Sequence, residues 1–148
     1  MLATATRAVA ESPDLDEAMR IIVEAAWKLT DCDASVLWLL DNHTNGFTLG
    51  GRSADMDWPV SRPRDKGGLT RAILDQGESV RIDDARIDER GRKGLVEQGT
   101  RSLIGVPINR QIETIGVLFV NSLQRAHFRP SDVSVLEAAA GQVSAGLG

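Results

Sequence analysis

The sequence predicts one α+β domain, in which an antiparallel sheet of about five or six strands carries the first and last helices on one face. The predicted elements follow in the order helix, hairpin, loop, helix, strand, hairpin, helix. Short polar turns separate the paired strands, as is typical of hairpins, and both ends of the chain repeat apolar residues at helical spacing. A chain of 148 residues is the usual size of one domain, so residues 1–148 are expected to share one core, with residues 1–11 as a tail or linker.

The first helix is expected over residues 12–30. Ser12 and Pro13 give it a start, because proline at the first helical position loses no needed hydrogen bond. Asp14 with Glu17 offers the alternative of a capping box. One apolar stripe with steps of four and three residues predicts the buried face of this helix: Leu15, Met19, Ile22, Ala26 and Leu29.

A hairpin and a long loop follow. Residues 35–40 are apolar on both faces and rich in strand formers, which indicates a central strand that is covered on both sides. Residues 41–46 form a turn cluster, and residues 47–52 form the second strand. Residues 53–66 show no periodicity, and a stretch of this length is often a functional loop or lid.

The middle and the second half of the chain complete the sheet. A short helix is expected over residues 69–76, ended by a glycine, and a short strand over residues 79–82. Residues 101–109 and 113–121 predict a second hairpin. Pro107 cannot donate to a strand ladder, so it is expected at a sheet edge or near the strand end.

The closing helix is expected over residues 131–147, with Ser131 as its cap. Its apolar residues repeat at steps of three and four, like those of the first helix. Such seams suit a helical bundle and a dimer interface; packing on the domain's own sheet, or both roles together, are the alternatives. The candidate residues of the two helices are Leu15, Met19, Ile22, Leu29, Leu136, Val143 and Leu147.

Composition argues against several functions. The chain has 17 basic and 21 acidic residues and a net charge of -4, so it has no general reason to bind nucleic acid. Its basic residues between positions 86 and 101 are interleaved with acidic ones, which indicates a solvated loop. The single cysteine excludes an internal disulfide and fits a reducing cytoplasm. No apolar run approaches the roughly 20 residues that span a bilayer, and no signal segment opens the chain, so a soluble cytoplasmic domain without membrane insertion is expected.

This order of elements, with its particular residues, resembles the GAF family of regulatory domains. The matching segments, over residues 14 to 145, are DLDE at 14–17, ASVLWLLD at 34–41, ILDQGESV at 73–80, IDDA at 82–85, SLIGVPI at 102–108, IGVL at 115–118 and FRPSD at 128–132. The resemblance implies a central antiparallel sheet of about six strands. It also implies terminal helices on one face of that sheet and a small-molecule pocket under mobile loops on the other.

The resemblance implies a sensory function as well. A small ligand, or the state of a neighbouring domain, would bias the arrangement of the terminal helices in a homodimer, and a ligand can do so only by binding one arrangement better. The helices would pass the change to an output domain in the same parent chain. By family frequency, the expected parent is a two-component sensor histidine kinase; cyclic-dinucleotide enzymes and transcription activators are the other usual outputs. The alternative is a structural dimerisation domain without ligand, whose pocket is filled by its own side chains.

Candidate pocket residues of such a domain are Trp58, Gly67, Gly68, Leu69, Ile82, Asp83 and Phe119. Backbone N–H groups at 67–69 open a helix and could hold an anionic group, although a plain glycine-rich helix start is the alternative. Trp58 could stack on a flat ligand or pack within its own loop, whereas Trp38 is expected in the core. No particular cofactor is predicted, and an unidentified small molecule is left open.

Cyclic-nucleotide binding, known in one subset of the family, is not expected here. Asn121, Phe128 and Asp132 match the signature of that subset. Ser122 and Val133 stand where the signature has a lysine and a glutamate, so both charges are missing. Asn121 and Asp132 are therefore expected to be a turn residue and a helix-start residue.

Pigment, metal and catalytic chemistry have little support in the sequence. Cys32 lacks an adjacent histidine for covalent bilin attachment, and His43 and His127 are expected at the surface rather than as haem ligands. Two histidines and one cysteine do not make a metal cluster. The reductases of the family use several cysteines, no nucleophile elbow is present, and the pair Asp83-Asp84 fits a turn. No enzyme activity of this domain is expected, although the parent protein could be a histidine kinase or a cyclic-dinucleotide enzyme.

Overall fold

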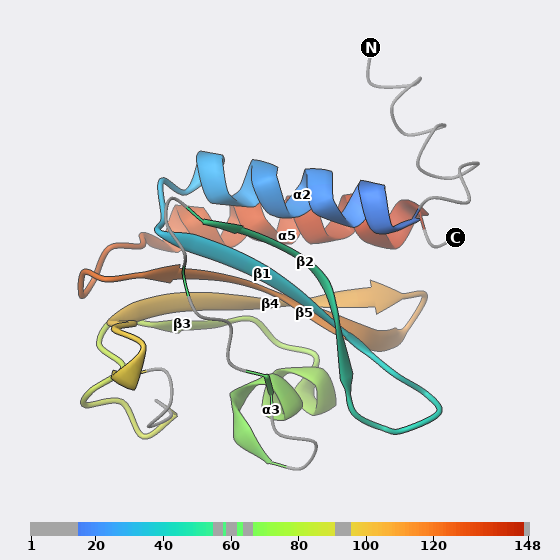
Figure 1. The fold of residues 1–148 in the computed structure, drawn as a ribbon, viewed down its shortest axis with the longest axis horizontal. Helices are drawn as coiled ribbons and strands as arrows, with labels where there is room; N and C mark the ends of the chain where they lie inside the picture. The colour runs from blue at the N-terminus through green and yellow to red at the C-terminus, as the bar shows by residue number, and fades with distance from the viewer. Residues whose placement is uncertain (1–14, 55–57, 59–61, 64–66, 91–95, 147–148) are drawn as a thin grey trace.

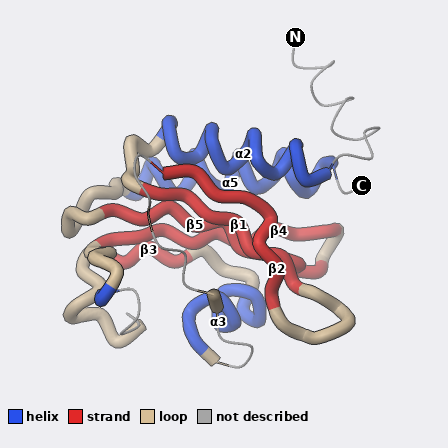
Figure 2. The backbone as a smooth tube through the Cα atoms, in the orientation of Figure 1, coloured by secondary structure: helices blue, strands red, loops and turns tan. Residues whose placement is uncertain are grey.

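An antiparallel sheet of five strands forms the middle layer of the computed structural model, which describes residues 15–54, 58, 62–63, 67–90 and 96–146. The elements are α2 (Leu15–Leu29), β1 (Ala34–Leu40), β2 (Phe47–Ala54), α3 (Gly68–Gln76), β3 (Val80–Ile82), β4 (Ser102–Arg110), β5 (Glu113–Ser122) and α5 (Pro130–Gly146). The strands lie in the order β2-β1-β5-β4-β3. Helices α2 and α5 cover one face of the sheet, and α3 covers the other (Figure 1, Figure 2). The predicted α+β class and the placement of the terminal helices are confirmed; the described residues form five strands where the resemblance implies about six.

The two terminal helices lie side by side and run antiparallel (Figure 1). Met19 and Ile22 of α2 are buried against the sheet, as the apolar stripe predicts. Because an α-helix turns once in about 3.6 residues, the buried face also takes in Val23. Leu29, in the last turn, is 64% exposed, so the buried stripe ends earlier than predicted. The expected helix start at residues 12–13 lies outside the described residues.

Two glycines in β2 bring α2 close to the sheet. The register between β1 and β2 shifts at Gly50, where β2 bulges. A Cβ atom on Gly51 would lie 3.2 Å from Val23 and 3.4 Å from the backbone of Arg20. Helix α2 therefore approaches β2 more closely than side chains at these positions would allow.

The ends of the two later helices follow local capping signals. Gly77 adopts the left-handed conformation, with φ of 68°, and its N–H donates back into α3 at 2.8 Å, which confirms the predicted glycine stop. Helix α5 begins at Pro130, and the N–H of Arg129 donates to the carboxylate of Asp132 at 2.8 Å. The prediction of Ser131 as the cap is therefore wrong, because the proline starts the helix one residue earlier. Asp132 is the helix-start residue that the sequence predicts.

Strand ends differ from the predicted ones by one or two residues. Strand β2 continues through Ala54, into the predicted loop. Asn121 lies inside β5 and pairs with Ala34, so the prediction of a turn residue is wrong; pairing with β1 extends the strand past it. Strand β3 pairs with β4 only over Leu103–Gly105, so Pro107 lies on an open stretch of edge, as predicted.

Gly116 in β5 is expected to tolerate no side chain. A Cβ atom there would lie 2.5 Å from the carbonyl oxygen of Trp38, and backbone in the middle of a sheet cannot move aside as a side chain can. We expect Gly116→Ala to lower the free energy of unfolding in urea by about 2–3 kcal/mol. The control is Ile112→Ala, since Ile112 is fully exposed in the turn between β4 and β5. Its effect is expected to stay within about 0.5 kcal/mol, and equal effects of the two variants would contradict this account.

Candidate functional site

Among the described residues, apolar side chains pack together on the face of the sheet opposite the terminal helices, where the resemblance implies a pocket. The buried residues of this face, which we call the α3-face cluster, are Trp38, Phe47, Ile73, Leu74, Ile82, Ala85, Leu103, Val117 and Phe119. A Cβ atom on Gly105 would lie 2.6 Å from both Ile73 and Phe119. The missing side chain at Gly105 thus lets Ile73 and Phe119 fill the space between α3 and the sheet. The core position predicted for Trp38 is confirmed.

Four of the candidate pocket residues are partly or fully buried. Ile82 and Phe119 belong to the α3-face cluster, and Leu69 packs against it, so the structure brings these three together. Trp58 is 5% exposed, and its carbonyl oxygen accepts a hydrogen bond from the guanidinium of Arg52. The burial of Trp58 favours packing within the protein, which the sequence left open beside contact with a ligand.

The other three candidates lie at the surface. Gly67 and Gly68 open α3 with φ of 72° and 78°, a region that favours glycine. Asp83 is exposed and forms an ion pair at 2.6 Å with an arginine in β3. The neighbouring Asp84 accepts hydrogen bonds from the side chain and the backbone N–H of Arg86, and these bonds lower the pKa of its carboxyl group. Asp84 therefore holds a turn through side-chain to backbone bonding, as predicted, whereas the carboxylate of Asp83 pairs with a side chain.

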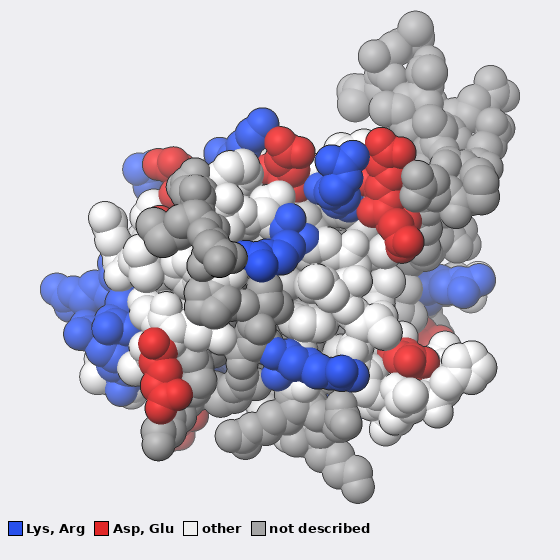
Figure 3. Space-filling view, in the orientation of Figure 1, with Lys and Arg blue, Asp and Glu red and all other residues white. Residues whose placement is uncertain are grey.

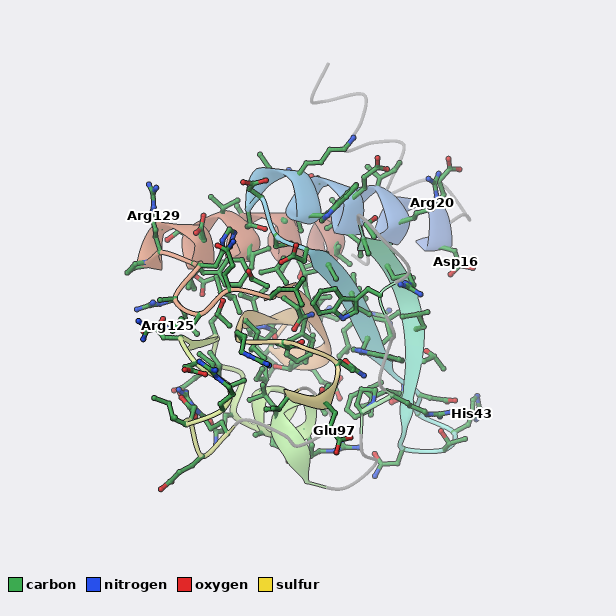
Figure 4. All side chains as sticks on the ribbon, turned by 60° about the vertical axis from the view of Figure 1, so that its left-hand side comes forward. Asp16, Arg20, His43, Glu97, Arg125 and Arg129 are labelled. Carbon is green, nitrogen blue, oxygen red and sulfur yellow. The ribbon has the colours of Figure 1, made fainter. Side chains whose placement is uncertain are left out.

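Arg71 fixes α3 against the turn between β1 and β2. Its guanidinium donates to the carbonyl oxygen of Asn45 at 2.6 Å and lies 5.0 Å from the centre of the Phe47 ring. A cation–π contact of this kind contributes about 0.5–1 kcal/mol at an exposed site. His43 projects from the same turn, away from the sheet, and is the surface residue that the sequence predicts (Figure 4).

The other histidine joins the ends of two helices. His127 is half-buried, and its Nε2 lies 3.2 Å from the carbonyl oxygen of Thr30, so it is less exposed than the surface position that the sequence predicts. This contact ties the end of α2 to the segment that precedes α5. Cys32 is buried near Thr30, and its thiol donates to the carbonyl oxygen of Ala34 at 3.3 Å. Among the described residues, no three His, Cys, Asp or Glu side chains are placed to hold a metal ion.

Burial raises the pKa of the Cys32 thiol to about 11, from an ordinary value of 9.0. The folded protein therefore holds this proton more tightly than the unfolded chain does. The resulting stability is fully present below pH 9.0 and is lost as the pH rises through about 11. The loss is at most about 2–3 kcal/mol. Urea unfolding across this pH range is expected to show it in the wild-type protein and not in Cys32→Ala, and parallel pH profiles would contradict it.

The predicted dimer seam is largely buried in the domain itself. Its residues in the cluster between the terminal helices and the sheet are Met19, Ile22, Leu136 and Val143. Leu29 is exposed, whereas the side chain of Leu15 and the whole of Leu147 lie outside the described residues. The stripes therefore pack on their own sheet, the alternative that the sequence left open, and a dimer through these helices would use their outer faces.

A groove between α5 and the open edge of β4 has no counterpart among the sequence predictions. It has a volume of about 590 Å³ and is lined by Gly77, Glu78, Ser79, Pro107, Asn109, Glu137, Ala140, Gly141 and Ser144. We call it the α5 groove. It exists because β3 pairs with only the first part of β4 and because α5 presents small residues beside that free edge. No local sequence pattern indicates that these three segments meet.

Hydrogen bonds tie the walls of the α5 groove together. The hydroxyl of Ser79 donates to Oε2 of Glu137 at 2.9 Å and links the α3–β3 turn to α5. The N–H of Asn109 donates to Oγ of Ser144 at 3.3 Å and links β4 to α5. The hydroxyl of Ser144 in turn donates to the carbonyl oxygen of Ala140 at 3.1 Å. The two serine hydroxyls and this backbone N–H are thus used within the wall, whereas the side-chain amide of Asn109 also lines the groove and is an uncharged donor.

Charges of both signs cover the exposed side of α2 (Figure 3). Arg20 pairs with Glu17 at 3.3 Å, and Lys28 pairs with Glu24 at 3.1 Å. In the charged loop after β3, two arginines pair with neighbouring aspartates, which supports a solvated loop rather than an anion site. In the part of the chain that the structure describes, no helix has the length and apolarity needed to cross a membrane.

Comparisons with known proteins place this geometry in context. A family model described as GAF domain matches residues 12–147. The GAF domain of an Acinetobacter phosphoenolpyruvate-protein phosphotransferase is 22% identical, with a TM-score of 0.78 over 99% of this chain and 89% of that one. The cyanobacteriochrome TePixJ GAF domain is 17% identical, with a TM-score of 0.75 over 94% and 92%. The free methionine-R-sulfoxide reductase from Neisseria meningitidis, solved with its substrate, is 18% identical, with a TM-score of 0.81 over 99% and 85%. No curated protein matches the sequence.

Proposed function

This chain belongs to the GAF domain family, and from that premise we propose that it is a sensory or regulatory domain whose terminal helices relay a signal to an output domain. Two of the structural neighbours are GAF domains of a phosphotransferase and of a cyanobacteriochrome, which supports a regulatory role. The observation that carries the proposal is the row of small, uncharged residues on the solvent side of α5.

Helix α5 is poor in charge on its solvent side. Exposed small residues follow one another there at steps of four, three and four: Ser134, Ala138, Gly141 and Ala145. We call these residues the α5 outer face. A surface helix normally places charged residues opposite its core side, and a helix without such a polar side is normally covered. Small side chains also let two helix axes approach to about 8 Å.

A second copy of the chain is the occupant that fits this face. Two outer faces would meet across a two-fold axis, so each small residue would contact the same surface of the other copy. The exposed side of α2 carries paired charges, which fit the polar rim of such an interface rather than its centre. The homodimer is thus centred on α5, not on the apolar stripes buried in the core.

The dimer gives the terminal helices a way to relay a signal. The start of α2 and the end of α5 lie at the same end of the helical layer (Figure 1). A change in how the two copies of α5 pack would therefore move both points together. The output domain would lie in the same parent chain, in the cytoplasm; a two-component sensor histidine kinase is the parent that family frequency favours. The domain itself is proposed to have no catalytic role.

A structural dimerisation domain without ligand is the second candidate function. The α3-face cluster favours it, because Ile73 and Phe119 occupy space that a ligand on that face would need. In this case the outer face of α5 would still pair two copies, and no small molecule would change the pairing.

Native mass spectrometry of the purified domain, across micromolar protein concentrations, separates these functions. The sensory proposal expects a dimer, and it expects a bound small molecule, either retained on purification or taken up from a screen of nucleotides, haem, keto acids and amines. A dimer that takes up nothing would support the structural alternative. A monomer at every concentration would contradict both.

A further inference from the structure

We propose that the α5 groove binds an organic cation, an ammonium or guanidinium group on a short aliphatic chain. The site lies beside α5, on a different side of the domain from the α3-face cluster. The proposal that a cation binds here depends only on the residues of the groove. Its consequence for signalling rests on the proposed function, because a ligand there would touch the helix that pairs two copies.

Charge is the first argument for a cation. Of the residues that line the groove, only Glu78 and Glu137 are ionisable, and both are acidic. The hydroxyl of Ser79 holds Oε2 of Glu137 at 2.9 Å, which fixes that carboxylate on the groove wall. A carboxylate has about four acceptor sites, so Glu137 retains capacity for a donor from a ligand. Hydrogen bonds between a cation and a carboxylate are about twice as strong as neutral ones.

The remaining polar groups also favour a donor-rich ligand. Pro107 has no N–H, so the open edge of β4 cannot donate at that position. The next outward donor, the N–H of Asn109, is already bonded to Ser144. An anion would therefore find only uncharged donors, such as the side-chain amide of Asn109, beside two carboxylates. An added β-strand would find a ladder interrupted at Pro107.

The size and walls of the groove suit a small molecule or one side chain. Its volume of about 590 Å³ lies in the range of small-molecule sites, roughly 300–1,000 Å³. Pro107, Ala140 and Gly141 supply apolar wall for an aliphatic chain. Such a chain would lie between the carboxylates and the edge of the sheet, in contact with both α5 and the α3–β3 turn.

Binding would link these two elements. Glu137, Ala140, Gly141 and Ser144 of α5 all line the groove. A cation held between Glu137 and the turn at Glu78 would add a second bridge to the one that Ser79 makes. It would thereby favour the position of α5 in which both bridges form, and so bias how two copies of α5 pack.

Titration of the dimeric domain with agmatine, which carries both cationic groups on one short chain, tests the proposal. Backbone amide signals in NMR spectra should shift saturably at Glu78, Ser79 and Gly141. Glu137→Gln, at the carboxylate that Ser79 fixes, should weaken binding about tenfold, and Glu78→Gln about threefold. The matched control, Glu89→Gln in the exposed loop after β3, should stay within twofold of wild type. No saturable shift at these residues, or equal weakening by Glu137→Gln and Glu89→Gln, would overturn the proposal.

Two further titrations identify the source of the cation and keep the outcomes separate. A capped Gly-Arg-Gly peptide that binds more tightly than agmatine would assign the groove to an arginine side chain of a partner protein, and the reverse order to a free amine. Succinate, an anion of similar length, should not bind; binding as tight as that of agmatine would overturn the charge argument. Dimerisation is measured independently by sedimentation. A monomer that binds agmatine would therefore contradict the proposed signalling through a dimer and would support the cation site in the α5 groove.

Discussion

Replacement of Ile73 by alanine is expected to lower the free energy of unfolding by about 3 kcal/mol. Ile73 is fully buried and contacts the sheet where Gly105 leaves room for it beside Phe119. Removal of three side-chain carbons there leaves a cavity, because the backbone of α3 is held by Arg71 at the β1–β2 turn. Urea unfolding, monitored by circular dichroism, measures the loss.

This variant asks whether the α3 face is a core or a closed pocket. The matched control is Ile112→Ala, since Ile112 lies fully exposed in the β4–β5 turn, and its effect should stay within about 0.5 kcal/mol. A loss of unfolding free energy near 3 kcal/mol only for Ile73→Ala supports a filled core. The α5 groove would then be the better candidate for a ligand site. A loss below about 1 kcal/mol for Ile73 would mean that the face is loosely packed and able to admit a ligand.

Ala138→Glu is expected to raise the dimer dissociation constant at least about 100-fold. Ala138 is exposed in the middle of the α5 outer face. In a two-fold interface the substitution occurs twice, so two like charges would be brought together out of water. Sedimentation velocity over a concentration series measures the change.

The fold of the Ala138→Glu monomer should be unaffected, because the side chain points to solvent and glutamate is a good helix former. Ile87→Glu is the control, since Ile87 is 84% exposed in the loop after β3 and carries no part of the proposed interface. Equal dissociation constants for the two variants would show that the copies pair elsewhere. Circular dichroism spectra of both variants should match that of the wild type.

The pairing of the strands could be predicted from the sequence because it depends on local signals. The turn cluster at residues 41–46 and the polar turn before Glu113 each separate two strand-forming runs, and both hairpins form. The same holds for the glycine stop at Gly77 and for the edge position of Pro107. In each case a neighbour in the chain supplies the physical constraint.

Features that depend on contacts between distant segments of the chain could not be predicted from local sequence signals. The helical stripe predicts Leu29 in the core, but burial depends on what lies opposite each residue, and Val23 is buried instead. Trp58 lies in a polar stretch and yet is buried. The α5 groove combines a turn, a strand edge and a helix, and only the fold brings Ser79 within 2.9 Å of Glu137.

Distance measurement between spin labels in the dimer tests the central claim most directly, namely that two copies pair through the α5 outer face. In a Cys32→Ala background, one sample carries a label at Gln142→Cys, exposed on α5, and another at Ile112→Cys, in the β4–β5 turn. Pairing through α5 predicts a defined and shorter distance between the two labels at position 142 than between those at position 112. A shorter distance at position 112, or no dipolar coupling at position 142 in a sample shown to be dimeric, would contradict the account.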